Sequence, residues 1–166
     1  MNKLESSRLI EDFTIDDLPG SKLKAVYQYW LDVKGDAEMP TRVDLNPKDM
    51  AKFLSNISLV DVEHDTGRYK FRLIGSDSVR AIGFDPTGRY LDEVELMEGH
   101  LKPRYDWLVK TRRPYIVTDK LKWAEKSYLD FFSIGLPLTQ GGEEVDILMY
   151  GSLYSLPKTS MSLFAL

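Results

Sequence analysis

Apolar residues recur at helical spacing in the segment SKLKAVYQYWLDVKG, near the start of the chain. Side chains three or four positions apart lie on one face of a helix. This spacing aligns Leu23, Val26, Tyr27, Trp30 and Leu31. The pattern therefore predicts an amphipathic helix at residues 21–34, which Ser21 can cap at its start and Gly35 can end.

Two later segments also carry helix signals. Asn46 and Pro47 suit an N-cap and a first helical position, so we expect a short helix at residues 47–54. The segment EGHLKPRYDWLVKTRRP predicts a longer helix at residues 98–113. Its apolar stripe consists of Leu101, Tyr105 and Leu108.

Strand patterns dominate the remainder of the chain. ISLVDVEH and YKFRLIG, joined by a turn, predict a β-hairpin. PYIVTDKLKW, YLDFFSIGLPL and VDILMYGSLYS predict three closing strands, the last two joined by TQGGEE. A hairpin, a helical crossover and a three-stranded meander give one five-stranded antiparallel sheet of the α+β class.

Three glycines, Gly75, Gly83 and Gly88, punctuate the stretch between the hairpin and the longer helix. Their spacing matches neither a P-loop nor a dinucleotide fingerprint, which argues against a phosphate cradle. We expect Gly75 to let the chain leave the sheet sharply. Gly83 and Gly88 then stop two short helical turns, the first capped by Ser76 or Asp77, so that the stretch forms a lid over one face of the sheet.

The last predicted strand is apolar on both of its faces. Val145, Ile147 and Met149 alternate with Leu148, Tyr150 and Tyr154. A strand with one solvated face would carry polar residues at every second position, so both faces should be covered. The short helices can cover one face, and the helix at residues 21–34, or a second subunit, can cover the other.

Composition and charge exclude several classes of protein. The 166 residues suit one domain, which we place at residues 21–155 between a flexible arm at 1–20 and a tail at 156–166. The net charge of −4 argues against a dedicated nucleic-acid binder. The sequence shows no membrane-spanning apolar run, no secretory leader and no cysteine. We therefore expect a cytoplasmic protein without nucleic-acid or membrane partners.

Several short motifs stand out in combination. They are Tyr29-Trp30, the loop MPTRVDLNP, the strand end FRLIGSD, the turn FDPTGR and the three closing strands. Over residues 22–155 the combination resembles a PAS domain, of the single-domain type common in alphaproteobacteria. The resemblance implies a PAS-like five-stranded antiparallel sheet with short helices over one face and an N-terminal amphipathic helix.

The resemblance also implies a sensory or adaptor module in signal transduction. PAS domains of this kind bind a small ligand or cofactor between sheet and helices, or dimerise through an N-terminal helix. No effector domain follows the last predicted strand, which implies an effector protein in trans. The residues expected at a ligand are Phe71, Arg72, Leu73, Tyr105, Leu108, Phe132 and Tyr150. Those expected at a homodimer interface are Leu23, Val26, Tyr27 and Trp30.

Arg72 is the most informative charged residue, because it lies in a strand whose sheet should be covered on both sides. A buried arginine requires a partner. One interpretation is an ion pair with Asp61, Asp130 or Asp146; the other is a clamp for a ligand carboxylate. The ion pair is the favoured interpretation, since buried charge usually finds a protein partner. Arg42 and Asp44 should tie their own loop together.

The sequence offers little for cofactor or metal chemistry. Its two histidines are His64, in the predicted hairpin turn, and His100, at the start of the longer helix. One histidine is weak evidence for haem ligation, and no ligand set for a metal is apparent. The absence of cysteine excludes the photochemistry of flavin-binding and coumaric-acid-binding relatives. We expect a colourless protein with no cofactor and no metal.

No catalytic constellation is apparent either. The paired carboxylates Glu143-Glu144 and Asp16-Asp17 lie in a loop and in the arm, whereas acid–base catalysis needs carboxylates in a cleft. The prediction is a non-enzymatic sensor or adaptor that binds a small ligand, a partner protein or both. Two alternatives stay open: a small ligand-binding enzyme on a curved α+β sheet, and a ligand-free structural interaction domain.

Overall fold

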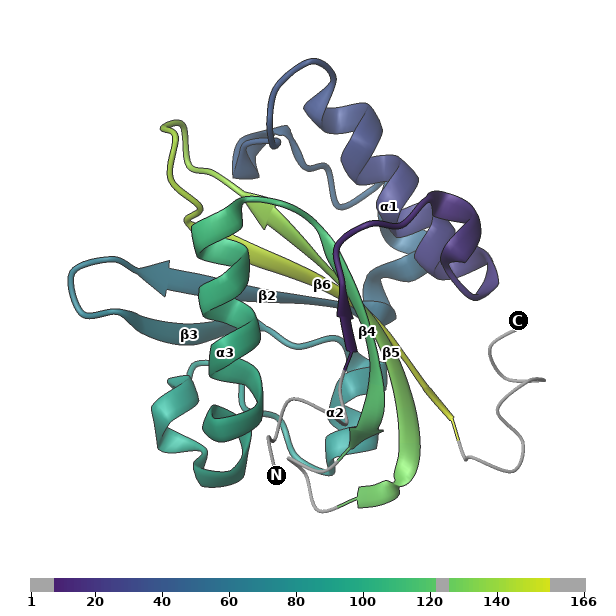
Figure 1. Ribbon diagram of the computed structural model, residues 1–166, viewed down its shortest axis with the longest axis vertical. Helices are drawn as coiled ribbons and strands as arrows, with labels where there is room; N and C mark the ends of the chain where they lie inside the picture. The colour runs from purple at the N-terminus through teal and green to yellow at the C-terminus, as the bar shows by residue number, and fades with distance from the viewer. Residues whose placement is uncertain (1–7, 122–125, 156–166) are drawn as a thin grey trace.

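A six-stranded antiparallel sheet forms the centre of the fold (Figure 1). The computed structural model of the chain describes residues 8–121 and 126–155. The strands follow the spatial order β1-β4-β5-β6-β2-β3. Their bounds are β1 Arg8–Ile10, β2 Ile57–Glu63, β3 Arg68–Leu73, β4 Tyr115–Leu121, β5 Lys126–Leu138 and β6 Ile147–Ser155. The tail predicted at 156–166 and the last residues of the strand predicted at 114–123 lie outside the described residues.

The sixth strand, β1, corrects the predicted count of five. It lies in the segment that we expected to be an arm, and it pairs with β4 through the register Leu9 to Val117. Leu18, further along the same segment, is buried. Three residues are too few to show the alternation by which a strand is recognised in a sequence. Their pairing depends instead on the free edge that β4 presents.

The helices fall close to the predicted segments. They are α1 Gly20–Lys34, α2 Ser76–Ile82 and α3 Glu95–Thr111, with 3-10 turns η1 Ile15–Asp17, η2 Arg42–Asp44, η3 Ala51–Asn56 and η4 Leu91–Glu93. Three details of the prediction are wrong. The helix expected at 47–54 is the 3-10 turn η3, and Gly75, not Ser76 or Asp77, occupies the N-cap of α2. Ser21, expected to cap the first helix, lies inside α1, whose N-cap is Pro19. None of the described helices has both the length and the apolar content needed to cross a membrane.

α1 packs on one face of the sheet, against β5 and β6. Leu23, Val26 and Trp30 are buried, and the indole nitrogen of Trp30 donates a hydrogen bond to the Pro137 carbonyl at 3.0 Å. Gly151 makes this approach close, because a Cβ there would meet Leu23 at 3.1 Å. A helix that buries three large side chains in this way is an integral layer of the domain.

The opposite face is covered by α3 and by residues 76–93, which we call the lid segment (Figure 1). Part of the lid segment also closes the outer edge of β3. The amide of Gly88 donates to the Phe71 carbonyl at 2.7 Å, and the amide of Phe71 donates to the Arg89 carbonyl at 2.9 Å. These bonds satisfy backbone groups that an open edge would expose. The described part of the sheet is thus layered on both faces.

The three glycines of this stretch have two different roles. Gly83 and Gly88 have φ angles of 96° and 87°, in the left-handed region that favours glycine. Gly75 has an ordinary φ of −60°, and its role is spatial. A Cβ there would lie 2.5 Å from the Ser55 carbonyl oxygen and 2.6 Å from that of Ile57. Gly75 therefore lets two backbone segments pack together. The neighbouring sequence does not reveal this role.

We predict that Gly75→Ala lowers the free energy of unfolding by roughly 1–3 kcal/mol, the usual cost of forcing an atom into a packed site. Gly99→Ala is the matched control, because Gly99 lies in α3 with no atom within 4 Å of its virtual Cβ. The free energy of unfolding of this control variant should rise by roughly 0.5–1 kcal/mol. Urea unfolding followed by circular dichroism measures both. Equal stabilities of the two variants would contradict the close approach at Gly75.

Candidate functional site

A small cavity of about 60 Å³ lies between the sheet and the helices that cover it. Such a volume has room for roughly four to six water-sized atoms. It is well below the roughly 300–1,000 Å³ of sites for drug-sized ligands. Residues of the strands and helices share its wall: Val60, Phe71, Tyr115, Val117, Phe131, Ser133, Tyr150, Ser152 and Tyr154 on the sheet, and Ser78, Ile82, Met97, Leu101, Arg104 and Tyr105 on the helices.

Arg104 brings a buried charge to this wall. Its side chain is 9% exposed, and Nη2 donates a hydrogen bond at 2.9 Å to Oδ2 of Asp119, whose side chain is 5% exposed. The guanidinium also lies 5.6 Å from the ring centre of Phe131. Because a buried charge is costly without a partner, Asp119 is needed to keep Arg104 in place. The pair leaves this side of the cavity without net charge.

Three tyrosine rings pack together beside Arg104, in tilted and edge-to-face contacts. The rings of Tyr105 and Tyr150 are 5.3 Å apart, and the hydroxyls of Tyr115 and Tyr150 share a hydrogen bond of 2.7 Å. Burial raises the pKa of Tyr105, of Tyr115 and of Tyr150 above the ordinary value. All three phenols therefore keep their protons at neutral pH. They can donate or accept hydrogen bonds, but they are poor bases.

The other polar groups of the wall also pair within the chain. Ser133 and Ser152 share a hydrogen bond of 2.9 Å between neighbouring strands. Ser78 of α2 and Tyr154 of β6 share another of 2.9 Å, which connects the lid segment with the sheet across the cavity. An occupant would therefore meet a mostly apolar wall on which most of the hydroxyls already have partners. Some of these hydroxyls must exchange partners before they can bind a ligand.

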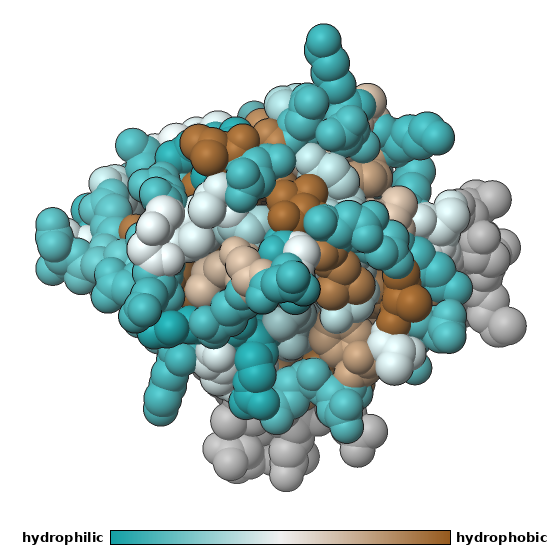
Figure 2. Space-filling view, turned by 90° about the horizontal axis from the view of Figure 1, so that it is seen from above, coloured by the Kyte–Doolittle hydropathy of each residue, from teal (hydrophilic) through white to brown (hydrophobic). Residues whose placement is uncertain are grey.

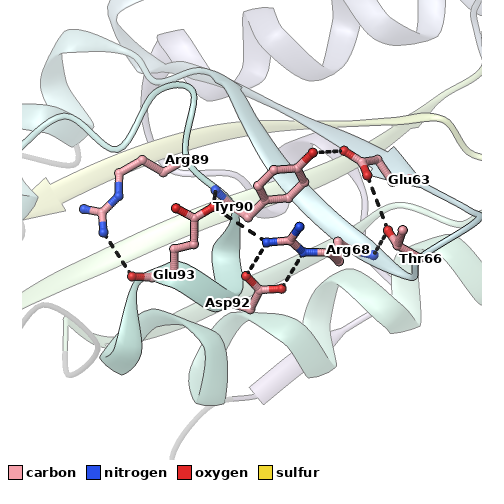
Figure 3. Close-up of polar contacts among 7 residues, drawn as sticks. All are labelled: Glu63, Thr66, Arg68, Arg89, Tyr90, Asp92 and Glu93. Carbon is pink, nitrogen blue, oxygen red and sulfur yellow. Dashed lines mark hydrogen bonds and ion pairs between the residues drawn. The ribbon is translucent and has the colours of Figure 1, made fainter.

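A network of charged and aromatic side chains holds the outer end of the lid segment to the β2–β3 hairpin (Figure 3). Arg68 donates to both carboxylate oxygens of Asp92, at 2.7 and 2.8 Å, and its guanidinium lies 3.6 Å from the ring centre of Tyr90. The hydroxyl of Tyr90 in turn donates to Glu63. The hydrogen bond from Arg68 lowers the pKa of Asp92. The network thus fixes η4 through contacts that remain open to solvent.

The structure brings three of the predicted ligand residues together at the cavity. Phe71, Tyr105 and Tyr150 lie on its wall, and each is buried. Leu108 is fully buried too, but it belongs to the surrounding core and is not a wall residue. Of the stripe predicted on the longer helix, Tyr105 therefore reaches the cavity wall, whereas Leu108, about one turn later, does not.

Arg72, Leu73 and Phe132 lie away from the cavity. The Arg72 side chain is 40% exposed and Nε donates to Oδ1 of Asp61 at 2.7 Å, so its expected burial is wrong, although Asp61 was one of the partners considered. Leu73 is 42% exposed. Phe132 points to the α1 face, because successive side chains of a strand alternate, and Phe131 takes the place at the cavity.

The most important residues that the sequence analysis missed are Arg104 and Asp119. A signal for each was present. Arg104 falls on the stripe of Leu101, Tyr105 and Leu108 at helical spacing, so a charged residue interrupts a buried face. Asp119 lies two positions after Val117 in β4, on the cavity side of the strand. Two opposite charges on two apolar faces indicate a buried pair.

The histidines and the loop residues lie outside the cavity wall. His100 is half-buried in α3, whereas His64 lies at the β2–β3 turn with Nε2 2.9 Å from the Val145 carbonyl oxygen. The loop of Arg42 is closed differently from the expectation. Asp44 accepts a hydrogen bond of 2.6 Å from the Thr41 hydroxyl, and the amide of Arg42 donates to the Thr139 carbonyl.

The four residues expected at a dimer interface are mostly used within the chain. Leu23, Val26 and Trp30 are buried against the sheet, while Tyr27 is half-buried and packs between Phe13 and Trp30. Seen from above, the surface carries separate hydrophobic areas among hydrophilic atoms (Figure 2). Homodimerisation stays a prediction, and these contacts leave Tyr27 as the part of the stripe that can still meet another chain.

We predict that Arg104→Met lowers the free energy of unfolding by about 3–5 kcal/mol, because it leaves the Asp119 carboxylate buried without its cation. The double variant Arg104→Met, Asp119→Leu should recover most of this loss. Urea unfolding of Arg104→Met, of Asp119→Leu and of the double variant measures the coupling free energy between the two residues. Losses that simply add in the double variant would show that the pair is not coupled.

We also predict that stability falls as the pH rises above about 10, the ordinary tyrosine pKa. The raised pKa values mean that the folded protein keeps protons that the unfolded chain loses. Stability is therefore full below this pH and is lost as the pH rises toward the folded-state values. Phenolate absorbance should appear together with loss of circular dichroism, and less steeply in a Tyr115→Phe, Tyr150→Phe variant. Complete ionisation of a still-folded protein would contradict this.

Comparisons with known proteins agree with this architecture. A family model described as a PAS domain matches residues 20–148. Among solved structures, the chain is similar to one titled an RNA-binding light-oxygen-voltage receptor, with a TM-score of 0.55 and 11% identity. The alignment covers 95% of this chain and 40% of that one, so the likeness shows the fold alone. No curated protein gives a significant match. The resemblance predicted from the motifs is confirmed, and the chain belongs to the PAS domain family.

Proposed function

We propose that the chain is a sensory module that binds a small uncharged molecule in the cavity and reports its presence to a partner protein through the lid segment. The observation that carries the proposal is the cavity itself, which is lined by Arg104, a tyrosine cluster and several serines on a mostly apolar wall. Membership of a family with sensor-type folds supports it. A concave apolar site with a few convergent polar groups is the usual form of a small-molecule site.

The wall indicates what kind of molecule would fit. Asp119 already neutralises Arg104, so a charged ligand would find no free counter-charge in this pair. The phenols of Tyr115 and Tyr150 remain protonated because burial raises their pKa values, and they can donate to an acceptor. The ligand is therefore small, neutral and mostly apolar, with one hydrogen-bond acceptor.

The lid segment offers a route from the cavity to the surface. Ser78 and Ile82 of α2 lie on the cavity wall, while Asp92 of the same segment belongs to the exposed network around Arg68. An occupant that displaces α2 would change the geometry of the hydrogen bonds and ion pairs in that network. A partner that contacts the exposed side of the lid segment would then distinguish the occupied form from the empty one.

A non-enzymatic role is part of the proposal. Asp119, the carboxylate behind the wall residue Arg104, is paired with that arginine at 2.9 Å. The pKa values of Tyr105, Tyr115 and Tyr150 are raised by burial, whereas a catalytic base must give up its proton near neutral pH. These groups suit binding better than proton transfer.

The small cavity volume favours a second candidate function. At about 60 Å³, with wall hydroxyls such as Ser133 and Ser152 paired to each other, the domain can also act as an interaction module with a nearly filled core. In that case the exposed lid segment or α1 would serve as the binding surface. The two candidates differ in one observable property, which is whether a small molecule enters the cavity.

We predict that cyclopentanone, a compact ring with one carbonyl acceptor, gives saturable amide shifts around the cavity when the protein is titrated by NMR. Val117→Phe should abolish them, because its ring fills space at the wall, where Val117 is 2% exposed. Ile116→Leu is the control, since Ile116 lies on the opposite face of β4 and the substitution conserves volume.

Native mass spectrometry of the purified wild-type protein complements the titration, because a co-purified molecule would appear as a mass that denaturation removes. Shifts that persist in Val117→Phe would place the probe elsewhere. Neither a co-purified molecule nor saturable shifts would overturn the ligand proposal and leave the interaction module.

A further inference from the structure

We propose that His64, Glu144 and Asp146 form a binding site for a zinc-type divalent transition metal. The site lies where the β2–β3 turn meets the β5–β6 loop, at one end of the sheet (Figure 1). His64 comes from the turn, and the two carboxylates come from the loop. The site is separate from the cavity wall, and it stands or falls independently of the sensory function proposed above.

The three donor atoms are spaced as ligands of one ion would be. Nε2 of His64 lies 3.3 Å from Oδ1 of Asp146 and 3.7 Å from Oε2 of Glu144, and the donor atoms all lie within 4.8 Å of one another. Bonds of about 2.0–2.1 Å to a tetrahedral zinc ion place neighbouring ligand atoms roughly 3.3–3.4 Å apart. The observed spacing needs only small side-chain movements to reach that geometry.

Backbone hydrogen bonds hold the ligand-bearing segments together before any ion binds. The amide of Val62 donates to the Asp146 carbonyl at 2.9 Å, and the amide of Asp146 donates to the Leu138 carbonyl at 2.9 Å. Asp146 is thereby fixed between β2 and the end of β5. His64 follows Val62 by two residues, so the same contacts set its distance from the loop.

The Asp146 carboxylate is also oriented. Its Oδ2 accepts hydrogen bonds from the Gln140 amide at 2.8 Å and from the Thr139 hydroxyl at 3.3 Å. These bonds leave Oδ1 directed toward His64. Outer hydrogen bonds that fix a ligand in this way are a general feature of protein metal sites. Glu144 is the adaptable member, since its side chain is 71% exposed.

The donor types select the class of ion. An imidazole nitrogen with two carboxylates suits zinc and its neighbours, whereas magnesium and calcium prefer oxygen ligands alone. The competing arrangement is an ion-pair cluster without a metal, in which Nε2 donates to the Val145 carbonyl oxygen, 2.9 Å away. Selectivity between zinc and magnesium therefore separates a built site from a group of surface charges.

Titration calorimetry of the full chain with zinc chloride, after treatment with a chelator, tests the proposal. We expect saturable binding that His64→Gln and Asp146→Asn each weaken at least tenfold. The asparagine keeps an oxygen for Gln140 and Thr139, so the loop should hold its shape. His100→Gln and Glu143→Gln are matched controls that should bind zinc like the wild type. Magnesium chloride should give no comparable signal.

Two further measurements guard against misfolding and against binding elsewhere. Zinc should raise the Tm of the wild type but not of His64→Gln, while the two proteins unfold alike in chelator. Amide shifts on zinc addition should concentrate at residues 62–66 and 139–147. Zinc binding that is unchanged in His64→Gln, or magnesium binding as strong as zinc binding, would overturn the proposal and leave an ion-pair cluster only.

Discussion

The strands β5 and β6 are buried on both faces over residues 131–138 and 147–152, and the remainder of the fold depends on this constraint. Gly135 and Gly151 show how closely both layers approach. A Cβ on Gly135 would lie 2.6 Å from the Tyr115 ring, and one on Gly151 would lie 3.1 Å from Leu23 of α1. The two glycines sit one register step apart on neighbouring strands. Side chains at these positions would push away the tyrosine cluster on one face and α1 on the other.

This double covering determines where polar groups can lie. On the α1 side the core is apolar, and Trp30 directs its one polar atom to a strand carbonyl. On the other side the layer is built from two separate elements, α3 and the lid segment. The cavity and the paired polar groups beside it, such as Arg104 with Asp119, lie between these elements and the sheet. The candidate site thus lies on the face whose covering is shared between two elements.

Local patterns predicted most of the fold, and long-range partners account for what was missed. The stripe of Leu23, Val26 and Trp30 specifies the buried face of one helix, and these residues are buried as expected. The last strand is apolar on both faces, and its residues Ile147 and Leu148, on opposite faces, are both buried as expected. The strand β1 exists only because β4 offers an edge. The role of Gly75 depends on the carbonyls of Ser55 and Ile57, which no pattern around Gly75 reveals.

The candidate site was harder to predict, because each of its members depends on which face of an element turns inward. Phe131 and Phe132 are adjacent, so alternation alone could not assign the cavity to the correct ring. Arg104 was recognisable in principle as a charge on an apolar stripe, but its meaning required Asp119, whose strand had not yet been placed beside α3. Pairs of this kind can be predicted only when both elements are considered together.

The buried polar groups are best explained by what they prevent. An apolar pair at Arg104 and Asp119 would often be as stable as the ion pair, so stability alone does not explain the two charges. A charged pair, however, must keep its geometry, and it resists collapse of α3 onto the sheet, since collapse would separate the charges or leave them unpaired. The tyrosine hydroxyls at Tyr115 and Tyr150 constrain the same region in the same way. A polar framework of this kind can keep a small space open in a core where leucine or phenylalanine would fill it.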